Sequence, residues 1–136
     1  MSVVLGYDES PGAERALDAA INIALRFGEP LILVYGVAPP GAEGEEFRSH
    51  QQALEELGRT AASHAVARAG EKGVEATIEI VRAKPAEALV EVADRNDATL
   101  IVVGSYGESP IRGALLGSTP HRLLHLSSRP VLVVPE

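Results

Sequence analysis

The residues best suited to chemistry lie in one glycine-rich segment near the end of the chain. Its glycines are Gly104, Gly107, Gly113 and Gly117. Ser118 and Thr119 follow at the expected start of a helix. Glycine lets the backbone approach a ligand closely, and a helix N-terminus offers unpaired N–H groups and a partial positive charge that bind phosphate. The two hydroxyl groups add donors, so the segment is predicted to cradle a triphosphate.

Two common nucleotide-binding motifs are absent from the chain. No Gly-Lys-Ser/Thr triplet occurs, so the segment is not a Walker A loop, and no G-x-G-x-x-G follows the first apolar run. The competing interpretation is that the glycines only form turns and caps. Long loops in compact domains are often functional, and this favours the nucleotide site.

Asp8 and Arg112 are the charged residues next to the predicted site. Asp8 follows the first apolar run, where it either contacts the ligand or caps the next helix. Arg112 lies between Gly107 and Gly117, where it either binds the β- or γ-phosphate or points into solvent. Arg122, one turn into the last helix, is expected to face solvent.

The sequence predicts no catalytic residue and no metal site. His121 and His125 have the four-residue spacing of metal ligands, but the glutamate and the third ligand of a zincin are missing. Surface histidines are therefore expected. Ser10, Ser105 and Ser109 have no histidine placed to activate them, and no G-x-S-x-G elbow occurs. A Ser-His-Asp hydrolase is disfavoured.

Five short apolar runs must position these residues as β-strands. Four are nearly continuous, as in strands buried on both faces of a parallel sheet, whereas the third alternates and is expected at an edge. Helical patterns separate them, and this alternation predicts an α/β fold with one open parallel sheet and right-handed crossovers. The expected strands are Val3–Tyr7, Leu31–Tyr35, Ala76–Val81, Thr99–Val103 and Pro130–Val134.

Four helices are expected between the strands. The first is capped by Ser10, begins at Pro11 and ends before Gly28; the second covers Phe47–Ala69; the third begins at Pro85 and the fourth near Ser118. Three-and-four spacing assigns their apolar residues to the inner face. These residues are Ala13, Leu17, Ala20, Ala24 and Phe27; Leu54, Leu57, Ala61 and Ala65; and Ala86, Leu89, Val90 and Ala93. The fourth helix carries Leu123, Leu124 and Leu126.

Length and composition suit one domain over residues 1–136. The chain is 46% hydrophobic and lacks cysteine, which excludes a disulfide framework and thiol chemistry. Its net charge of −7, with scattered basic residues, disfavours nucleic-acid binding. No signal peptide and no apolar run of about 20 residues is visible. We therefore expect a cytoplasmic protein that does not enter the membrane.

Three separated motifs make the chain similar to a known family. Gly104, Gly107, Gly117 and Ser118 fit the G-x2-G-x9-G-(S/T) pattern, and residues 4–10, 100–107 and 129–134 resemble the opening strand, fourth strand and last strand of the same proteins. The chain thus resembles the ATP-binding universal stress proteins over its whole length. The resemblance implies an adenine-nucleotide alpha-hydrolase-like fold, with strand order 3-2-1-4-5 and helices on both faces.

The resemblance also implies roles for individual residues. Asp8 would lie by the adenine and ribose, and the Gly36 backbone and Val103 would meet the base. Three residues depart from the usual pattern, namely Gly36, Thr119 and Pro120. The remaining implied contacts lie along the ribose and phosphates: Gly104 and Gly107, and then Gly117, Ser118 and Thr119. The implied ligand is ATP, AMP or ADP, with or without Mg²⁺.

Three functions remain open at this level. The first is an ATP-binding regulatory module of the stress response, whose occupancy changes partner binding. The second is a slow Mg²⁺-dependent ATPase or phosphoryl-transfer protein, although no general base is evident. The third is a dimeric interaction protein without nucleotide. The resemblance implies a homodimer through the edge strand Pro130–Val134, an edge that can pair with another chain.

Overall fold

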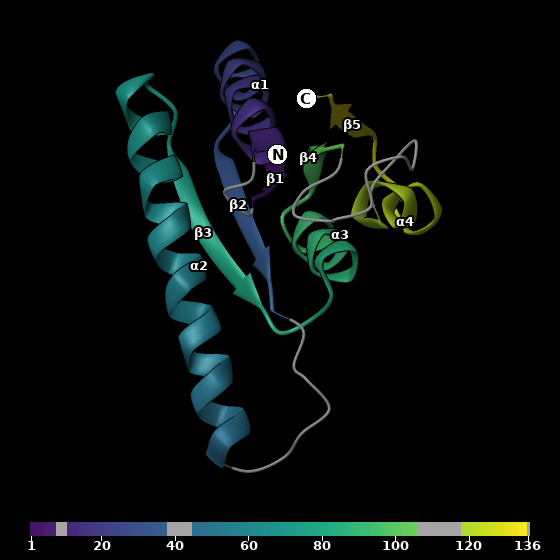
Figure 1. Ribbon diagram of the computed structural model, residues 1–136. Coiled ribbons are helices and arrows are strands. Elements are labelled where there is room, and N and C mark those ends of the chain that lie inside the picture. Colours follow the sequence, from purple (N-terminus) through teal and green to yellow (C-terminus); the bar gives the residue numbers. More distant parts are fainter. Residues whose placement is uncertain (8–10, 38–44, 106–117, 136) are drawn as a thin grey trace.

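The computed structural model describes residues 1–7, 11–37, 45–105 and 118–135. Strands and helices alternate along these residues, as predicted (Figure 1). Along the chain they are β1 (Ser2–Gly6), α1 (Pro11–Phe27), β2 (Leu31–Gly36), α2 (Glu45–Glu71), β3 (Ala76–Val81), α3 (Pro85–Arg95), β4 (Ala98–Gly104), α4 (Ser118–Leu126) and β5 (Val131–Val134).

The strands form one parallel sheet in the order β3-β2-β1-β4-β5. This confirms the predicted order, including the placement of the alternating strand and the last strand at the two edges. The central strands β1, β2 and β4 are largely buried, whereas β3 and β5 are mostly half-buried. Burial therefore follows position in the sheet, since an edge strand has a neighbour on one side only.

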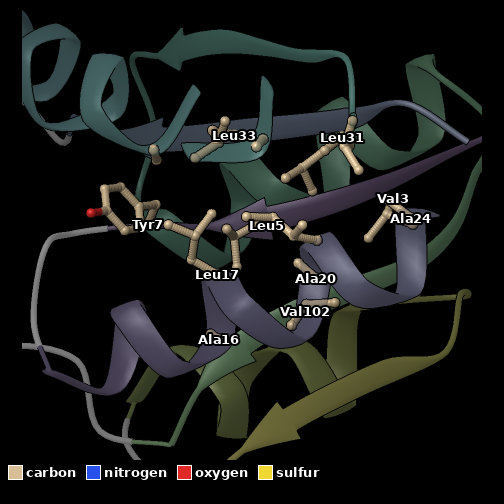
Figure 2. Close-up of a cluster of buried hydrophobic side chains, with 14 of the residues drawn as sticks. Val3, Leu5, Tyr7, Ala16, Leu17, Ala20, Ala24, Leu31, Leu33 and Val102 are labelled. Carbon is tan, nitrogen blue, oxygen red and sulfur yellow. The ribbon is translucent and has the colours of Figure 1, made fainter. Parts of the chain in front are cut away.

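Two apolar cores cover the two faces of the sheet. On one face, α1 packs mainly on β1 and β4, and the C-terminal half of α2 packs on β2 and β3, with Leu5, Leu17 and Leu33 at the centre of this core (Figure 2). On the other face, α3 and α4 bury Leu89 and Leu123 against the opposite side chains of the same strands. Alternate residues of each central strand supply the two cores. The sheet is thus covered by helices on both faces, as predicted.

The structure corrects the inner face of α2. Leu57 was expected to point inward, but it is 64% exposed. The adjacent Gly58 faces the sheet instead, so closely that a Cβ atom there would lie 2.7 Å from Cδ1 of Tyr35. Ala61 and Ala65 continue this buried face, as expected. The Tyr35 ring takes the space beside Gly58, and this orients the helix with Leu57 toward solvent.

Helix ends account for the other exposed apolar side chains. Phe27 was also expected inside, but it is 55% exposed at the last position of α1. The chain turns there through Gly28, whose φ of +66° is the left-handed conformation common just after helices. In α4, Leu123 is buried, whereas Leu124 and Leu126 are exposed. The periodic pattern therefore overestimates the apolar face near the ends of these helices.

Candidate nucleotide site

The topology singles out the carboxyl ends of β1 and β4. These strands are neighbours, yet α1 follows β1 on one face of the sheet, whereas α4 follows β4 on the other. In an open α/β sheet, ligands bind in the crevice created by such a reversal of strand order. The candidate site therefore lies between the last residues of these two strands and the first turns of α1 and α4.

Val103 forms the apolar floor of this edge. Its side chain is buried in the core beneath α3 and α4. It lies over Gly6 of β1, where an added Cβ atom would be 3.2 Å from Val103 Cγ1 and 3.0 Å from Leu89 Cδ1. The glycine at position 6 lets both side chains close over β1. This role of Gly6 was not predicted from the sequence, although its place at a strand end was a usable signal.

Gly104 connects the end of β4 to the first turn of α1. A Cβ atom at position 104 would lie 2.9 Å from the carbonyl carbon and oxygen of Gly12 and 3.3 Å from the Ala13 nitrogen. Two glycines thus allow a backbone-to-backbone contact between strand and helix. This packing accounts for glycine at position 104, and the predicted contact of Gly104 with a ligand stays a prediction.

Gly36 lies at the end of β2, beneath the turn that leads into α3. A Cβ atom there would be 2.9 Å from Pro85 Cα and 3.0 Å from the Ala83 carbonyl oxygen. The Val37 N–H donates to the Val81 carbonyl at 2.8 Å and holds the two strand ends together. The departure from the usual residue at position 36 therefore has a structural cause, since the β3–α3 turn fills the space of a side chain.

Ser105 follows β4 and is buried, with 7% of its surface exposed. Its N–H donates to the Val134 carbonyl at 3.1 Å and extends the pairing of β4 with β5. Its Oγ atom has no hydrogen-bond partner among the residues that the structure describes. From the sequence, Ser105 was assessed as a nucleophile, and the burial of its hydroxyl was not predictable.

Ser118 and Thr119 open α4, as predicted, with Ser118 exposed and Thr119 half-buried. Because β4, α4 and β5 form a parallel crossover, α4 starts at the carboxyl edge of the sheet and runs back along it. Its free N–H groups are therefore at the same edge as Val103 and Ser105. Four other predicted site residues lie outside the described ranges: Asp8, Gly107, Arg112 and Gly117.

Comparison with known proteins identifies the family. The sequence model of the universal stress protein family matches residues 1–135. The chain belongs to the universal stress protein family. It is 34% identical to a universal stress protein of Methanocaldococcus jannaschii, over 98% of this chain and 81% of the relative. It is also 34% identical to one of Mycolicibacterium smegmatis, of which it spans only 45%.

Solved universal stress proteins share the architecture. One in complex with cAMP has 34% identity and a TM-score of 0.72, over 99% of this chain and 96% of that chain. Another, from Archaeoglobus fulgidus in complex with dAMP, has 26% identity and a TM-score of 0.75, over 98% and 97%. Together with the observed strand order, these similarities confirm the adenine-nucleotide alpha-hydrolase-like fold.

An ion pair ties the first turn of α3 to α4 in this universal stress protein, one turn after α4 begins. Arg122, expected in solvent, is half-exposed and bonds Glu87 in the first turn of α3. The hydrogen bond from Arg122 is the main cause that holds the pKa of the Glu87 carboxyl below its ordinary value, and the positive charge of Lys84 adds to it. Arg122 is therefore occupied by a carboxylate beside the candidate site.

A second polar network lies on the α1 face of the same edge. The buried Tyr7 donates its hydroxyl to Glu14, whose other oxygen accepts a hydrogen bond of 2.8 Å from Arg68. Arg68 also pairs with Asp18 at 2.8 Å. The network joins β1, α1 and α2, and both of its carboxylates, Glu14 and Asp18, pair with Arg68. It braces the first turn of α1, which Gly104 contacts.

The described residues support no metal centre. His121 and His125 are exposed on α4, with ring centroids 5.2 Å apart in an edge-on arrangement. In the described ranges, no group of three or more histidine, cysteine or acidic residues is placed to hold a metal ion.

Within these ranges there is also no helix long and apolar enough to cross a membrane.

Proposed function

We propose that this universal stress protein binds an adenine nucleotide at the carboxyl ends of β1 and β4. The observation that carries the proposal is the reversal of strand order at this point, with an apolar floor at Val103 and a helix N-terminus at Ser118 on one face. The similar proteins solved with cAMP and dAMP support an adenine nucleotide as the ligand class.

The residues suit the two ends of such a ligand. Val103 would contact the base, beside the Gly36 backbone, and Asp8 would lie by the ribose. The N–H groups that begin α4 would bind phosphate oxygens, as helix N-termini do, together with the hydroxyls of Ser118 and Thr119. Gly104, Gly107 and Gly117 would admit the ligand to the backbone, and Arg112 would neutralise phosphate charge. ATP, ADP and AMP are the candidates, with Mg²⁺ on the phosphates of the first two.

We further propose a regulatory role in the stress response, carried by one domain over residues 1–136 in the cytoplasm. Phosphoryl transfer requires a positioned base and charge-neutralising cations. Of the described charged groups nearest the edge, Glu87 is bound by Arg122 and Glu14 by Arg68. A bound nucleotide would therefore act mainly by favouring one conformation over another, with slow hydrolysis as the alternative.

We also propose a homodimer through the edge strand Pro130–Val134. β5 lies at the end of the sheet and pairs with β4 on one side. Its apolar residues Val131–Val134 are all only half-buried. An apolar edge strand of this kind favours pairing with another chain, here antiparallel with a second copy.

Calorimetric titration with ATP, ADP, AMP and cAMP, with and without Mg²⁺, and with GTP for comparison, tests the nucleotide proposal. We expect micromolar binding of an adenine nucleotide and much weaker binding of GTP. Gly107→Val should abolish binding, because its side chain would occupy the space of the ligand, and Gly70→Val on the far part of α2 is the matched control. A folded protein that binds none of these nucleotides would leave the interaction-protein alternative.

A further inference from the structure

Ser105 is unusual among the buried polar side chains. Two described polar or charged residues are classed as buried, Ser2 with 3% of its surface exposed and Ser105 with 7%. The Ser2 hydroxyl donates a hydrogen bond to the Asn96 carbonyl oxygen at 3.4 Å. The Ser105 Oγ atom has no partner in the described part of the chain. Burying a hydroxyl without a hydrogen bond is unfavourable, so Ser105 calls for an explanation that Ser2 does not.

The other unpaired buried atoms do not raise the same question. They are one carboxylate oxygen each of Glu29 and Glu87. In both residues the second oxygen is bonded, to Thr99 at 2.8 Å in Glu29 and to Arg122 in Glu87. Each carboxylate is therefore partly satisfied, whereas the single polar atom of the Ser105 side chain is not.

The position of Ser105 directs its hydroxyl to the candidate site. The Ser105 N–H continues the β4–β5 ladder, so the strand geometry extends to this residue. Side chains alternate along a strand, and Gly104 faces α1. Ser105 thus shares the face of Val103, beneath α3 and α4. Its hydroxyl therefore stands on the face from which the first turn of α4 supplies N–H groups.

We propose that Ser105 is a ligand-binding residue of the nucleotide site, whose Oγ–H donates a hydrogen bond to a phosphate oxygen. The inference rests on the proposed function. A serine hydroxyl carries one donor, and the N-terminus of α4 favours an anion at this edge. A phosphate oxygen is therefore the acceptor that satisfies both the buried hydroxyl and the helix. The hydroxyl is desolvated before the ligand arrives, so binding does not need to remove water from it.

The test compares AMP with adenosine, the nucleoside that lacks the phosphate. The wild type, Ser105→Ala and Ser2→Ala are titrated with AMP and with adenosine, and urea unfolding is measured without ligand. We expect Ser105→Ala to weaken AMP binding by about 10- to 100-fold, the range for a hydrogen bond to a charged group. Adenosine binding should change less than about twofold, because no phosphate contact is lost. Unfolding without ligand should be unchanged or need more urea.

The matched serine and a conservative variant complete the design. Ser2→Ala, at the opposite end of the sheet, should unfold at lower urea concentration and bind AMP normally. Ser105→Thr keeps the hydroxyl and should retain most of the AMP affinity that Ser105→Ala loses. If the wild type binds AMP and Ser105→Ala binds it equally well, the inference about Ser105 is wrong but the proposed function stands. The same holds if Ser105→Ala loses as much affinity for adenosine as for AMP. If Ser105→Ala is less stable without ligand and its AMP affinity is unchanged, the hydroxyl stabilises the fold through a protein partner and does not bind the ligand. No wild-type binding of any adenine nucleotide would overturn the proposed function and this inference with it.

Discussion

Pro85 packs directly on Gly36, so closely that a Cβ atom at position 36 would lie 2.9 Å from Pro85 Cα. The contact joins the end of β2 to the first residue of α3. Both partners are backbone or ring atoms, which cannot move aside as the tip of a long side chain can. The contact therefore fixes where α3 begins at the candidate site.

Gly36→Ala should lower the free energy of unfolding by about 1–3 kcal/mol, the usual range for overpacking. Gly6→Ala should cost less, about 1 kcal/mol, because the added carbon would meet the ends of the Leu89 and Val103 side chains rather than backbone. Urea unfolding of the two variants measures the difference.

Gly70→Ala is the control for this pair. Position 70 lies in α2 with nothing within 4 Å of an added Cβ atom, so alanine should stabilise the helix by about 0.5 kcal/mol. Equal losses in Gly36→Ala and Gly6→Ala would contradict the distinction between backbone and side-chain neighbours.

Arg122→Gln should change how stability depends on pH. The pKa of Glu87 is lowered in the folded protein, chiefly by the hydrogen bond from Arg122. The stabilisation from this pair is therefore fully present above the ordinary pKa of a glutamate and is lost as pH falls through the folded-state pKa. The wild type should exceed Arg122→Gln in unfolding free energy near neutral pH, and the gap should narrow in acid.

Urea titrations from neutral to acidic pH measure this gap. Glu91→Gln removes an exposed carboxylate from α3, the helix of Glu87. Its unfolding free energy should differ little from that of the wild type at every pH. A gap for Arg122→Gln that is constant with pH would show that the charge of Glu87 does not contribute.

Proline in β5 should separate pairing with β4 from pairing with another copy. The Ile101 N–H donates to the Pro130 carbonyl at 3.0 Å, and the Ser105 N–H donates to the Val134 carbonyl at 3.1 Å. Backbone groups alternate in direction along a strand, so Leu132 faces β4 as these residues do, and Val133 presents its N–H to the open edge. Val133→Pro should therefore yield a folded monomer.

Sedimentation at micromolar concentration measures the change, and Leu132→Pro is the contrasting variant. Leu132→Pro removes a bond of the ladder within the sheet and should lower stability markedly. A Val133→Pro protein that sediments as a dimer, or a wild type that sediments as a monomer, would contradict dimerisation through this edge.

Strand and helix positions were predictable because local pattern and chain connectivity act together. Each predicted strand lies within one residue of the observed one at both of its ends. Gly28 ended α1 as expected, since few other residues adopt a positive φ without strain. The order of the strands came from the family resemblance and was confirmed.

The orientation of α2 was not predictable from its own residues. Leu57 fits the three-and-four spacing of the inner face, but Gly58 faces the sheet because it alone leaves room for the Tyr35 ring. Tyr35, whose ring decides this orientation, is more than twenty residues away from Gly58 in the chain. Periodicity within one helix carries no information about the shape of the surface that the helix covers.

By itself, the sequence determined the α/β class and the family, because these depend on short motifs and on alternation along the chain. The same motifs predicted the edge of the sheet where we propose that a ligand binds. Only the tertiary structure decided which small residues are small for packing and which polar residue lacks a partner. Gly36 and Gly104 accommodate neighbouring backbone, and the Ser105 hydroxyl is buried without a bond in the described chain. Such properties arise from distances between segments far apart in sequence, and no local pattern encodes those distances.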